Sequence, residues 1–268
     1  MKILFLGDIV GDTGFKAVKN NLPHIIKSKK IDFVCVNGEN AAKDGAGLTE
    51  NIANELYNVG VDVITTGNHV WDQKEIIEFI KKENKLLRPL NMIGNIPGNG
   101  FSIYNSKKNL KVGVLNLMGN VFMKKCDDVF KIASEFISNK KKFDEYDFLI
   151  VDFHGEITSE KMAIGNLFDG YATLVVGTHT HVPTNDARIL KNGTSYITDA
   201  GMCGDYDSII GMDLKNSINR FLKKDSVKHF PANGDASLSG VIVDCDASNG
   251  LAKNIESFIY GGSLKNTF

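Results

Sequence analysis

The chain has 268 residues, a length that suits one large α/β domain or two small ones. Hydrophobic residues make up 43% of the chain and charged residues 24%, as is usual for a globular protein. The formal net charge of −1 excludes a global electrostatic attraction to nucleic acid or to a membrane surface.

The cysteines and the apolar runs predict a cytoplasmic protein. Cys35, Cys126, Cys203 and Cys245 are scattered without a C-x-x-C pair, which is typical of a reducing compartment. The opening run KILFLG is too short for a signal peptide. No apolar run approaches the roughly 20 residues that a membrane helix needs, so we expect no membrane partner.

The first third of the chain alternates between buried strands and helices. Strands are predicted at 2–7, 32–38 and 61–69, and helices at 13–30, 48–60 and 72–83, where Asp72 is a plausible N-cap. This βαβαβα order predicts a parallel sheet that is covered by helices.

The remainder of the chain adds further strands, two helices and two hairpins. Strands are expected at 101–106, 111–117, 147–155 and 172–181, and helices at 127–142 and 159–170. Asn-Gly pairs at 192–193 and 249–250 predict hairpins over 187–198 and 241–260. No linker, repeat or low-complexity segment interrupts the chain, so a single domain over 1–268 is expected.

Polar side chains gather at the point where each predicted buried strand ends. In a parallel sheet the carboxyl ends of the strands share one edge, where ligands bind. Four of the six histidines lie at these positions, whereas His24 and His229 do not. The residues of this rim are Asp8, Glu39, Asn40, Asn68, His69, His154, His179 and His181.

The residue types of the rim favour metal ions. Imidazole nitrogens and carboxylate oxygens bind zinc, iron or manganese, and an asparagine carbonyl can fill a further position. The ligands are too many for one catalytic ion, which favours two ions that share a bridging carboxylate. Two ions roughly 3.5–4 Å apart are the usual clamp for phosphoryl displacement.

Other interpretations of the same residues are weaker. Alone, Asp8 could be a turn residue or a helix cap, and Glu39 with Asn40 could be turn chemistry. The glycines of the first turn could form a nucleotide cradle, but Gly7, Gly11 and Gly14 fit neither G-x-G-x-x-G nor the P-loop pattern. A carboxylate inside such a cradle would also repel the phosphate.

The motifs resemble those of a known superfamily. GNH at 67–69 and GTHTH at 177–181 are similar to the calcineurin-like metallophosphoesterases. The longer set GDIVG, NGEN, GNHVWD, DFHGEITSEK, GTHTHVPTND and TDAGMCG resembles one branch, the YmdB-like bacterial phosphodiesterases. This resemblance implies a four-layer α/β/β/α sandwich with mixed sheets.

Two departures from the broader superfamily support that branch. The superfamily usually has D-x-H at the first strand, whereas this chain has Val10 in place of the histidine. The second strand usually supplies an aspartate as the bridge, whereas this chain supplies Glu39. In the YmdB-like branch these changes occur together, because the glutamate bridges and Asn40 takes the vacant ligand position.

The resemblance implies a complete dinuclear centre, usually described with iron, although manganese or zinc is chemically reasonable. His69 would be the general acid that protonates the leaving oxygen. One ion would be held by Asp8, Glu39, Asn40 and His181, and the other by Glu39, Asn68, His154 and His179.

The resemblance also implies hydrolysis of cyclic nucleotides, most of all 2′,3′-cyclic nucleotides, by attack of a metal-activated hydroxide. Asp72 could orient His69, although a plain N-cap is the favoured interpretation. Candidate substrate-binding residues are Thr184, Asn185, Asp186, Met202 and Phe122.

The alternative function is a regulatory metal- and nucleotide-binding protein in which catalysis is secondary to partner or RNA-related signalling. The Lys-rich helix ends and the KKCDD segment leave room for such a partner, whereas a solvated face is the ordinary interpretation. Family members are often oligomers, so a homo-oligomer is also expected.

Overall fold

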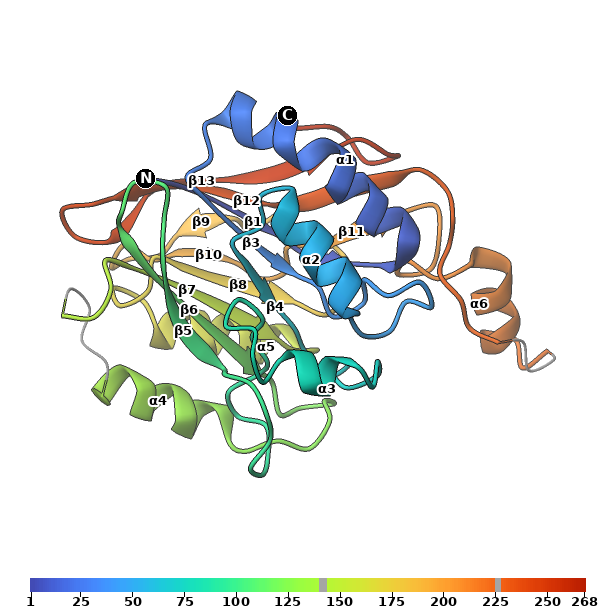
Figure 1. Ribbon diagram of the computed structural model, residues 1–268, viewed down its shortest axis with the longest axis horizontal. Coiled ribbons are helices and arrows are strands. Elements are labelled where there is room, and N and C mark those ends of the chain that lie inside the picture. Colours follow the sequence, from blue (N-terminus) through green and yellow to red (C-terminus); the bar gives the residue numbers. More distant parts are fainter. Residues whose placement is uncertain (140–143, 225–227) are drawn as a thin grey trace.

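Two mixed β-sheets form the centre of the computed structural model, which describes residues 1–139, 144–224 and 228–268 (Figure 1). The strands of the first sheet are β1 (Lys2–Leu6), β2 (Asp8–Ile9), β3 (Phe33–Asn37), β4 (Val63–Thr65), β11 (Met202–Asp205), β12 (Ala236–Asp246) and β13 (Leu251–Tyr260). Their order is β2-β11-β12-β1-β3-β4, and β13 pairs with β12 beside this path. Strands β1, β3 and β4 are parallel, whereas β12 runs antiparallel to β1.

The second sheet has the order β5-β6-β7-β8-β10-β9. Its strands are β5 (Phe101–Asn105), β6 (Lys111–Met118), β7 (Phe148–His154), β8 (Leu174–Thr178), β9 (Arg188–Ile189) and β10 (Ser195–Ile197). Strands β6, β7, β8 and β10 are parallel, and the edge strands β5 and β9 pair in the antiparallel sense. Both sheets are therefore mixed, as expected.

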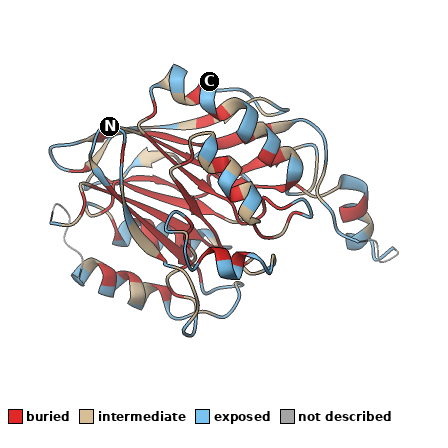
Figure 2. Cartoon of the chain, in the orientation of Figure 1, coloured by how far each residue is buried: buried red, intermediate tan, exposed pale blue. Residues whose placement is uncertain are grey.

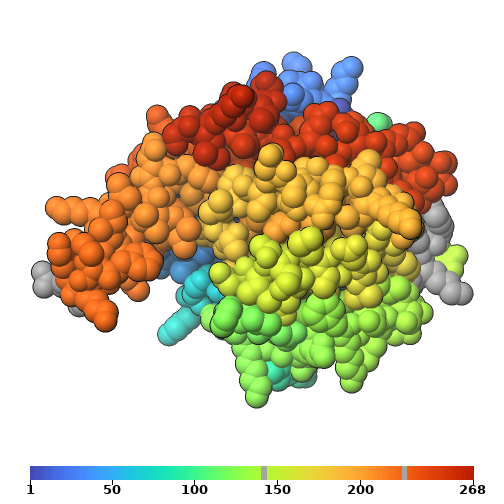
Figure 3. Space-filling model, turned by 180° about the vertical axis from the view of Figure 1, so that it is seen from behind, coloured from blue at the N-terminus to red at the C-terminus, as the bar shows by residue number. Residues whose placement is uncertain are grey.

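Helices cover the outer faces of the two sheets (Figure 1). The helices are α1 (Gly11–Lys29), α2 (Glu50–Asn58), α3 (Ile76–Phe79), α4 (Val129–Asn139), α5 (Thr158–Leu167) and α6 (Leu214–Phe221). Helices α1 and α2 pack on the first sheet, and α4 and α5 on the second. Helix α6 projects from the body of the protein, as the orange segment of Figure 3 shows from behind.

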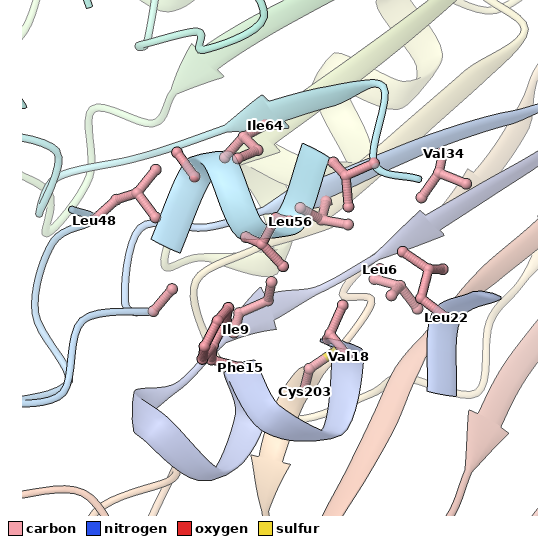
Figure 4. Close-up of a cluster of buried hydrophobic side chains, with 14 of the residues drawn as sticks. Leu6, Ile9, Phe15, Val18, Leu22, Val34, Leu48, Leu56, Ile64 and Cys203 are labelled. Carbon is pink, nitrogen blue, oxygen red and sulfur yellow. The ribbon is translucent and has the colours of Figure 1, made fainter. Parts of the chain in front are cut away.

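Three apolar layers hold the elements together. Side chains of α1, α2 and the first sheet form one layer, in which Leu6, Val18 and Leu56 meet (Figure 4). A second layer lies between the sheets and includes Phe5 and Phe148. A third layer joins β6, β7 and β8 to α4 and α5. The central strands are buried almost throughout, whereas the edge strands β5, β9 and β13 are partly exposed (Figure 2). This order of layers confirms the expected α/β/β/α sandwich.

Both predicted hairpins are confirmed. Strands β9 and β10 pair around the Asn-Gly at 192–193, and β12 and β13 pair around the Asn-Gly at 249–250. Cys35 and Cys245 lie in the layer between the sheets, as expected of small core residues. Residues 140–142 of the helix predicted over 127–142 lie outside the described residues.

The helix predicted over 72–83 is wrong except for the single turn of α3. Side chains before α3 are bound to neighbouring loops, which holds the chain in a series of turns. The amide of Gln73 donates to the Asp44 carboxylate and to the Ala46 carbonyl, and the Glu75 carboxylate accepts from the backbone of Glu50. Helix α6 and strands β2 and β11 were not predicted at all.

The glycines of the first turn permit close backbone contacts. A Cβ atom on Gly7 would lie 1.9 Å from the carbonyl oxygen of Gly201, and one on Gly14 would lie 2.0 Å from that of Cys203. Both positions therefore require glycine for packing within the first sheet and against α1. Within the described ranges, no helix has the length and apolar character that a bilayer span requires.

Candidate metal centre

The two sheets deliver the predicted ligands to one shared rim. Asp8 begins β2, Glu39 and Asn40 follow β3, and Asn68 follows β4, all in the first sheet. His154 ends β7 in the second sheet, and a short loop after β8 carries the last two ligands, His179 and His181. Hydrogen bonds and ion pairs across the rim link these side chains, so residues more than 100 positions apart in sequence become neighbours.

One cluster surrounds the Nε2 atom of His154. This atom lies 2.9 Å from Oε1 of Glu39, 3.1 Å from Oδ1 of Asn68 and 3.1 Å from Nδ1 of His179. Two ligands that are each about 2.1 Å from one ion and at right angles are about 3 Å apart. Glu39, His154 and His179 also form a group whose ligand atoms all lie within 4.8 Å of one another. This spacing fits the ligand set expected for one ion.

A second cluster contains two buried oxygen atoms without a hydrogen-bond partner in the described part of the chain. These are Oδ1 of Asp8 and Oδ1 of Asn40. The Asn40 amide nitrogen donates to the carbonyl of Gly45 at 2.9 Å, which fixes the direction of its oxygen. Nε2 of His181 lies 3.9 Å from the Asp8 oxygen. Buried oxygens without a partner are costly, and a cation would satisfy both.

Hydrogen bonds fix which nitrogen of each histidine is available to a ligand. The hydroxyl of Thr178 lies 2.7 Å from Oδ1 of Asp152 and donates its hydrogen there. The same hydroxyl oxygen therefore accepts from Nδ1 of His154, at 2.9 Å. Nδ1 of His181 donates to the carbonyl of Ile210 at 2.8 Å. In both rings the Nε2 atom faces the rim, as metal-binding histidines require.

Burial and mutual charge set the protonation of the metal-free rim. Burial lowers the pKa of His154, but the Glu39 carboxylate outweighs it and raises that pKa to about 9. Burial opposes ionisation of Glu39, yet the charge of His154 lowers its pKa to about 2. Burial and the charge of His154 lower the pKa of His179 to about 3. In the metal-free protein, His154 thus carries the positive charge at the centre of this cluster.

The backbone of the rim is strained. His179 has φ 97° and His181 has φ 65°, and such left-handed conformations cost roughly 1–3 kcal/mol each in non-glycine residues. Gly67 is required for a different reason, because a Cβ atom there would lie 2.3 Å from Nε2 of His154 and 2.5 Å from Oε2 of Glu39. The surrounding structure must therefore hold the ligands in position.

His69 stands beside the ligands, at the edge of the rim. Its backbone amide donates to Oε2 of Glu39 at 3.0 Å, and its Nδ1 lies 2.7 Å from Oδ2 of Asp72. The prediction that Asp72 caps a helix is wrong, because α3 begins at Ile76 and the Asp72 carboxylate is paired with His69. Nε2 of His69 is left available to a substrate.

The KKCDD segment contacts this part of the rim. Lys124 donates to the backbone carbonyl of Asn68 at 2.5 Å, and its Nζ lies 3.8 Å from Oδ1 of Asp72. Its side chain remains 58% exposed. Lys124, the first residue of the segment, therefore places a positive charge beside His69 and is not freely solvated.

A cavity of about 370 Å³ opens beside the rim, lined by residues that include Asn40, His69 and His181. None of the five predicted substrate-binding residues is among its lining residues. Thr184 and Asn185 line a separate cavity of about 280 Å³, and Asp186 is held by Thr184, Thr198 and Arg188. Met202 is buried and Phe122 is 86% exposed. Their role in substrate binding stays a prediction.

Sequence reasoning missed several residues of the site. Asp152 and Thr178 lie inside the quoted motifs DFHGEITSEK and GTHTHVPTND, yet no role was given to them. Asp152 lies two residues before His154, and alternate strand residues face the same side, so its position was an available signal. Thr178 lies opposite His154 on the neighbouring strand, a register that the sequence does not show. Lys228 and His229 line the larger cavity, and no sequence pattern marks them.

Comparison with known proteins identifies the family of this chain. A family model described as YmdB-like protein matches residues 4–258. The 2′,3′-cyclic-nucleotide 2′-phosphodiesterase of Bacillus subtilis is 46% identical over 97% of each chain. A crystal structure of a hypothetical protein from Thermus thermophilus is 36% identical, with a TM-score of 0.90 over 98% of this chain and 100% of that one.

A solved structure titled as a novel phosphatase from Mycoplasma pneumoniae is also 36% identical. Its TM-score is 0.89, over 97% of this chain and 93% of that one. These relatives confirm the metallophosphoesterase fold and place the chain among the phosphodiesterase enzymes. The chain belongs to the YmdB-like protein family.

Proposed function

We propose that this chain is a dinuclear metal phosphodiesterase that hydrolyses 2′,3′-cyclic nucleotides. The observation that carries the proposal is the division of the rim into two adjacent ligand clusters. One surrounds Nε2 of His154, and the other contains the unpartnered oxygens of Asp8 and Asn40. The name of the Bacillus subtilis relative supports the class of substrate.

Bound metal ions supply Lewis-acid chemistry, since they neutralise the phosphate oxygens and lower the pKa of water. Iron is the expected metal, with manganese or zinc as chemically reasonable alternatives. Glu39 would be the ligand shared by the two ions, as the family resemblance implies; its Oε1 lies 2.9 Å from Nε2 of His154, and its Oε2 accepts the backbone amide of His69. The second oxygen of Glu39 thus links the ligand set to the residue proposed as the acid.

His69 has the position of a general acid in this reaction. The Asp72 carboxylate accepts a hydrogen bond from Nδ1, which places the transferable proton on Nε2. The cavity beside this ring has room for a substrate, and the leaving ribose oxygen would take the proton from Nε2. Asp72 acts through His69 by accepting the hydrogen of Nδ1 and so holding the direction of the ring.

The test compares three variants with bis-p-nitrophenyl phosphate and a panel of cyclic nucleotides as substrates. His69→Ala keeps the metal ions and loses roughly 10²–10⁴-fold in kcat. Asp8→Ala loses metal as well as activity, and Asp72→Asn keeps metal with a smaller loss of kcat than His69→Ala. Full activity in Asp8→Ala or His69→Ala would contradict the proposal, and so would a metal-free active enzyme.

A further inference from the structure

A buried ion pair lies behind the loop that carries the last two ligands. Nζ of Lys161, on α5, donates to Oδ2 of Asp199 at 2.6 Å, and both side chains are 1% exposed. Lys161 belongs to the motif DFHGEITSEK and Asp199 to the motif TDAGMCG. Neither residue has a role in the catalytic scheme above. Burying two charges is expensive, which calls for a reason beyond general stability.

The Asp199 carboxylate binds the middle residue of the ligand loop. Oδ2 accepts the backbone amide of Thr180 at 3.2 Å and its hydroxyl at 2.6 Å. Oδ1 accepts the backbone amide of Gly201 at 2.8 Å, so both oxygens are engaged. Thr180 lies between His179 and His181, both of which have left-handed backbone conformations.

The opposite side of the same loop is held by the rim itself. The backbone amide of His179 donates to Oδ2 of Asp8 at 3.1 Å. The loop is therefore held from both sides, by a metal ligand in front and by Asp199 behind. Release of the contact behind would remove the anchor of Thr180, the residue between the two strained histidines.

The second sheet leaves space for the Lys161 side chain to reach Asp199. A Cβ atom on Gly177 would lie 3.0 Å from Cδ of Lys161 and 1.8 Å from the carbonyl oxygen of Thr198. Gly177 therefore leaves room for the lysine stem to reach Asp199 from α5. The side chain is enclosed along its length, which fixes the direction of its ammonium group.

We propose that Lys161 and Asp199 are positioning residues that hold His179 and His181 in metal-binding geometry. Lys161 neutralises and orients the Asp199 carboxylate, and Asp199 fixes the loop through Thr180. The inference rests on the proposed metal centre, because the position of the two histidines matters for binding only if they hold a metal ion. Replacement of the pair by apolar side chains can preserve folding, but it removes the acceptor for Thr180.

The experiment measures Mn²⁺ affinity and metal-free melting temperature in the full chain. Asp199→Asn, Lys161→Met and the double variant Lys161→Met/Asp199→Leu are compared with the wild type. We expect the Mn²⁺ Kd to rise about 10–100-fold in all three variants, as for other residues that orient metal ligands. The double variant is expected to melt above Lys161→Met in chelator, because no unpaired charge is buried, while its Mn²⁺ affinity stays low.

Wild-type affinity in Asp199→Asn or in the double variant would overturn the inference and leave the metal centre intact. A wild-type chain that binds no Mn²⁺ would overturn the proposed function and this inference with it. Thr180→Val replaces the charge variants if these fail to fold. It removes only the hydroxyl bond to Asp199 and is expected to weaken Mn²⁺ binding several-fold. Thr194→Val is the control; it removes a buried hydroxyl that is bonded to the Ala172 and Phe168 carbonyls and to the Gly170 amide and to no residue of the rim. Equal Mn²⁺ affinities in the two threonine variants would also overturn the inference.

Discussion

Thr178→Val tests the relay that fixes the ring of His154. The hydroxyl of Thr178 donates to Asp152 at 2.7 Å and accepts from Nδ1 of His154 at 2.9 Å. Valine has the same shape and can make neither bond. Loss of one hydrogen bond to a carboxyl group and one to the imidazole costs about 2–4 kcal/mol. We expect the melting temperature to fall by at least about 4 °C.

The same substitution should weaken metal binding, because Nε2 of His154 is the ligand atom only while Nδ1 carries the hydrogen. Residues that orient a metal ligand typically contribute 10–100-fold in affinity, so we expect the Mn²⁺ Kd to rise by about that factor. Isothermal titration measures the Kd, and ¹⁵N NMR of the imidazole in the Zn²⁺-loaded protein reports which nitrogen carries the hydrogen.

Thr173→Val is the matched control for this experiment. Its buried hydroxyl also donates one hydrogen bond, to the Gly250 carbonyl at 2.7 Å, and accepts one, from the amide of Leu149 at 3.0 Å. It should lose stability with unchanged Mn²⁺ affinity. The reasoning is refuted if Thr178→Val binds Mn²⁺ within twofold of the wild type, or if His154 keeps its hydrogen on Nδ1 in that variant.

Three further predictions concern the rim as a whole. The pKa of His154 in the metal-free protein is raised from 6.5 to about 9, so its ion pair with Glu39 stabilises fully below about pH 6.5 and is lost as pH rises through about 9. Between about pH 6.5 and 9, the melting temperature in chelator should fall, and the Mn²⁺ affinity should rise by up to about tenfold per pH unit. A melting temperature and an Mn²⁺ Kd that do not change with pH would contradict this. Gly67→Ala places a Cβ atom 2.3 Å from Nε2 of His154 and should reduce the metal content per chain to less than half, measured by plasma emission spectrometry. Chelation should lower the wild-type melting temperature, since an ion at 100 times its Kd contributes about 2.7 kcal/mol. Asp8→Asn, which removes a ligand of only one of the two proposed ions, should show a smaller fall on chelation than the wild type.

The shared location of the rim residues could be predicted because these residues follow strands. A buried apolar run followed by a carboxylate or imidazole predicts a strand end and a ligand together, and parallel pairing brings such ends to one edge. Asp8, Glu39 and His154 were predicted in this way. The cavity residues Lys228 and His229 could not be predicted, because no local pattern shows that the chain returns there after α6.

The failed helix at 72–83 illustrates a different limit. Its apolar spacing was helical, but Gln73 and Glu75 form hydrogen bonds with residues that are more than 20 positions away. Such tertiary contacts override a short helical pattern. Asp72 was consequently misread as a cap, although its distance of three residues from His69 was visible in the sequence.

The origin of the proposed ligands on two separate sheets would make a metal-loaded rim a cross-link. An ion held by Glu39 and His154 would be bonded to both halves of the sandwich at once, much as a disulfide joins two segments. Binding would then demand a definite separation between the sheets. That separation is set by the side chains packed between them, Phe5 and Phe148 among them. Substitutions in this interior layer should therefore alter metal selectivity without touching any ligand, which makes the core a determinant of which metal the enzyme uses.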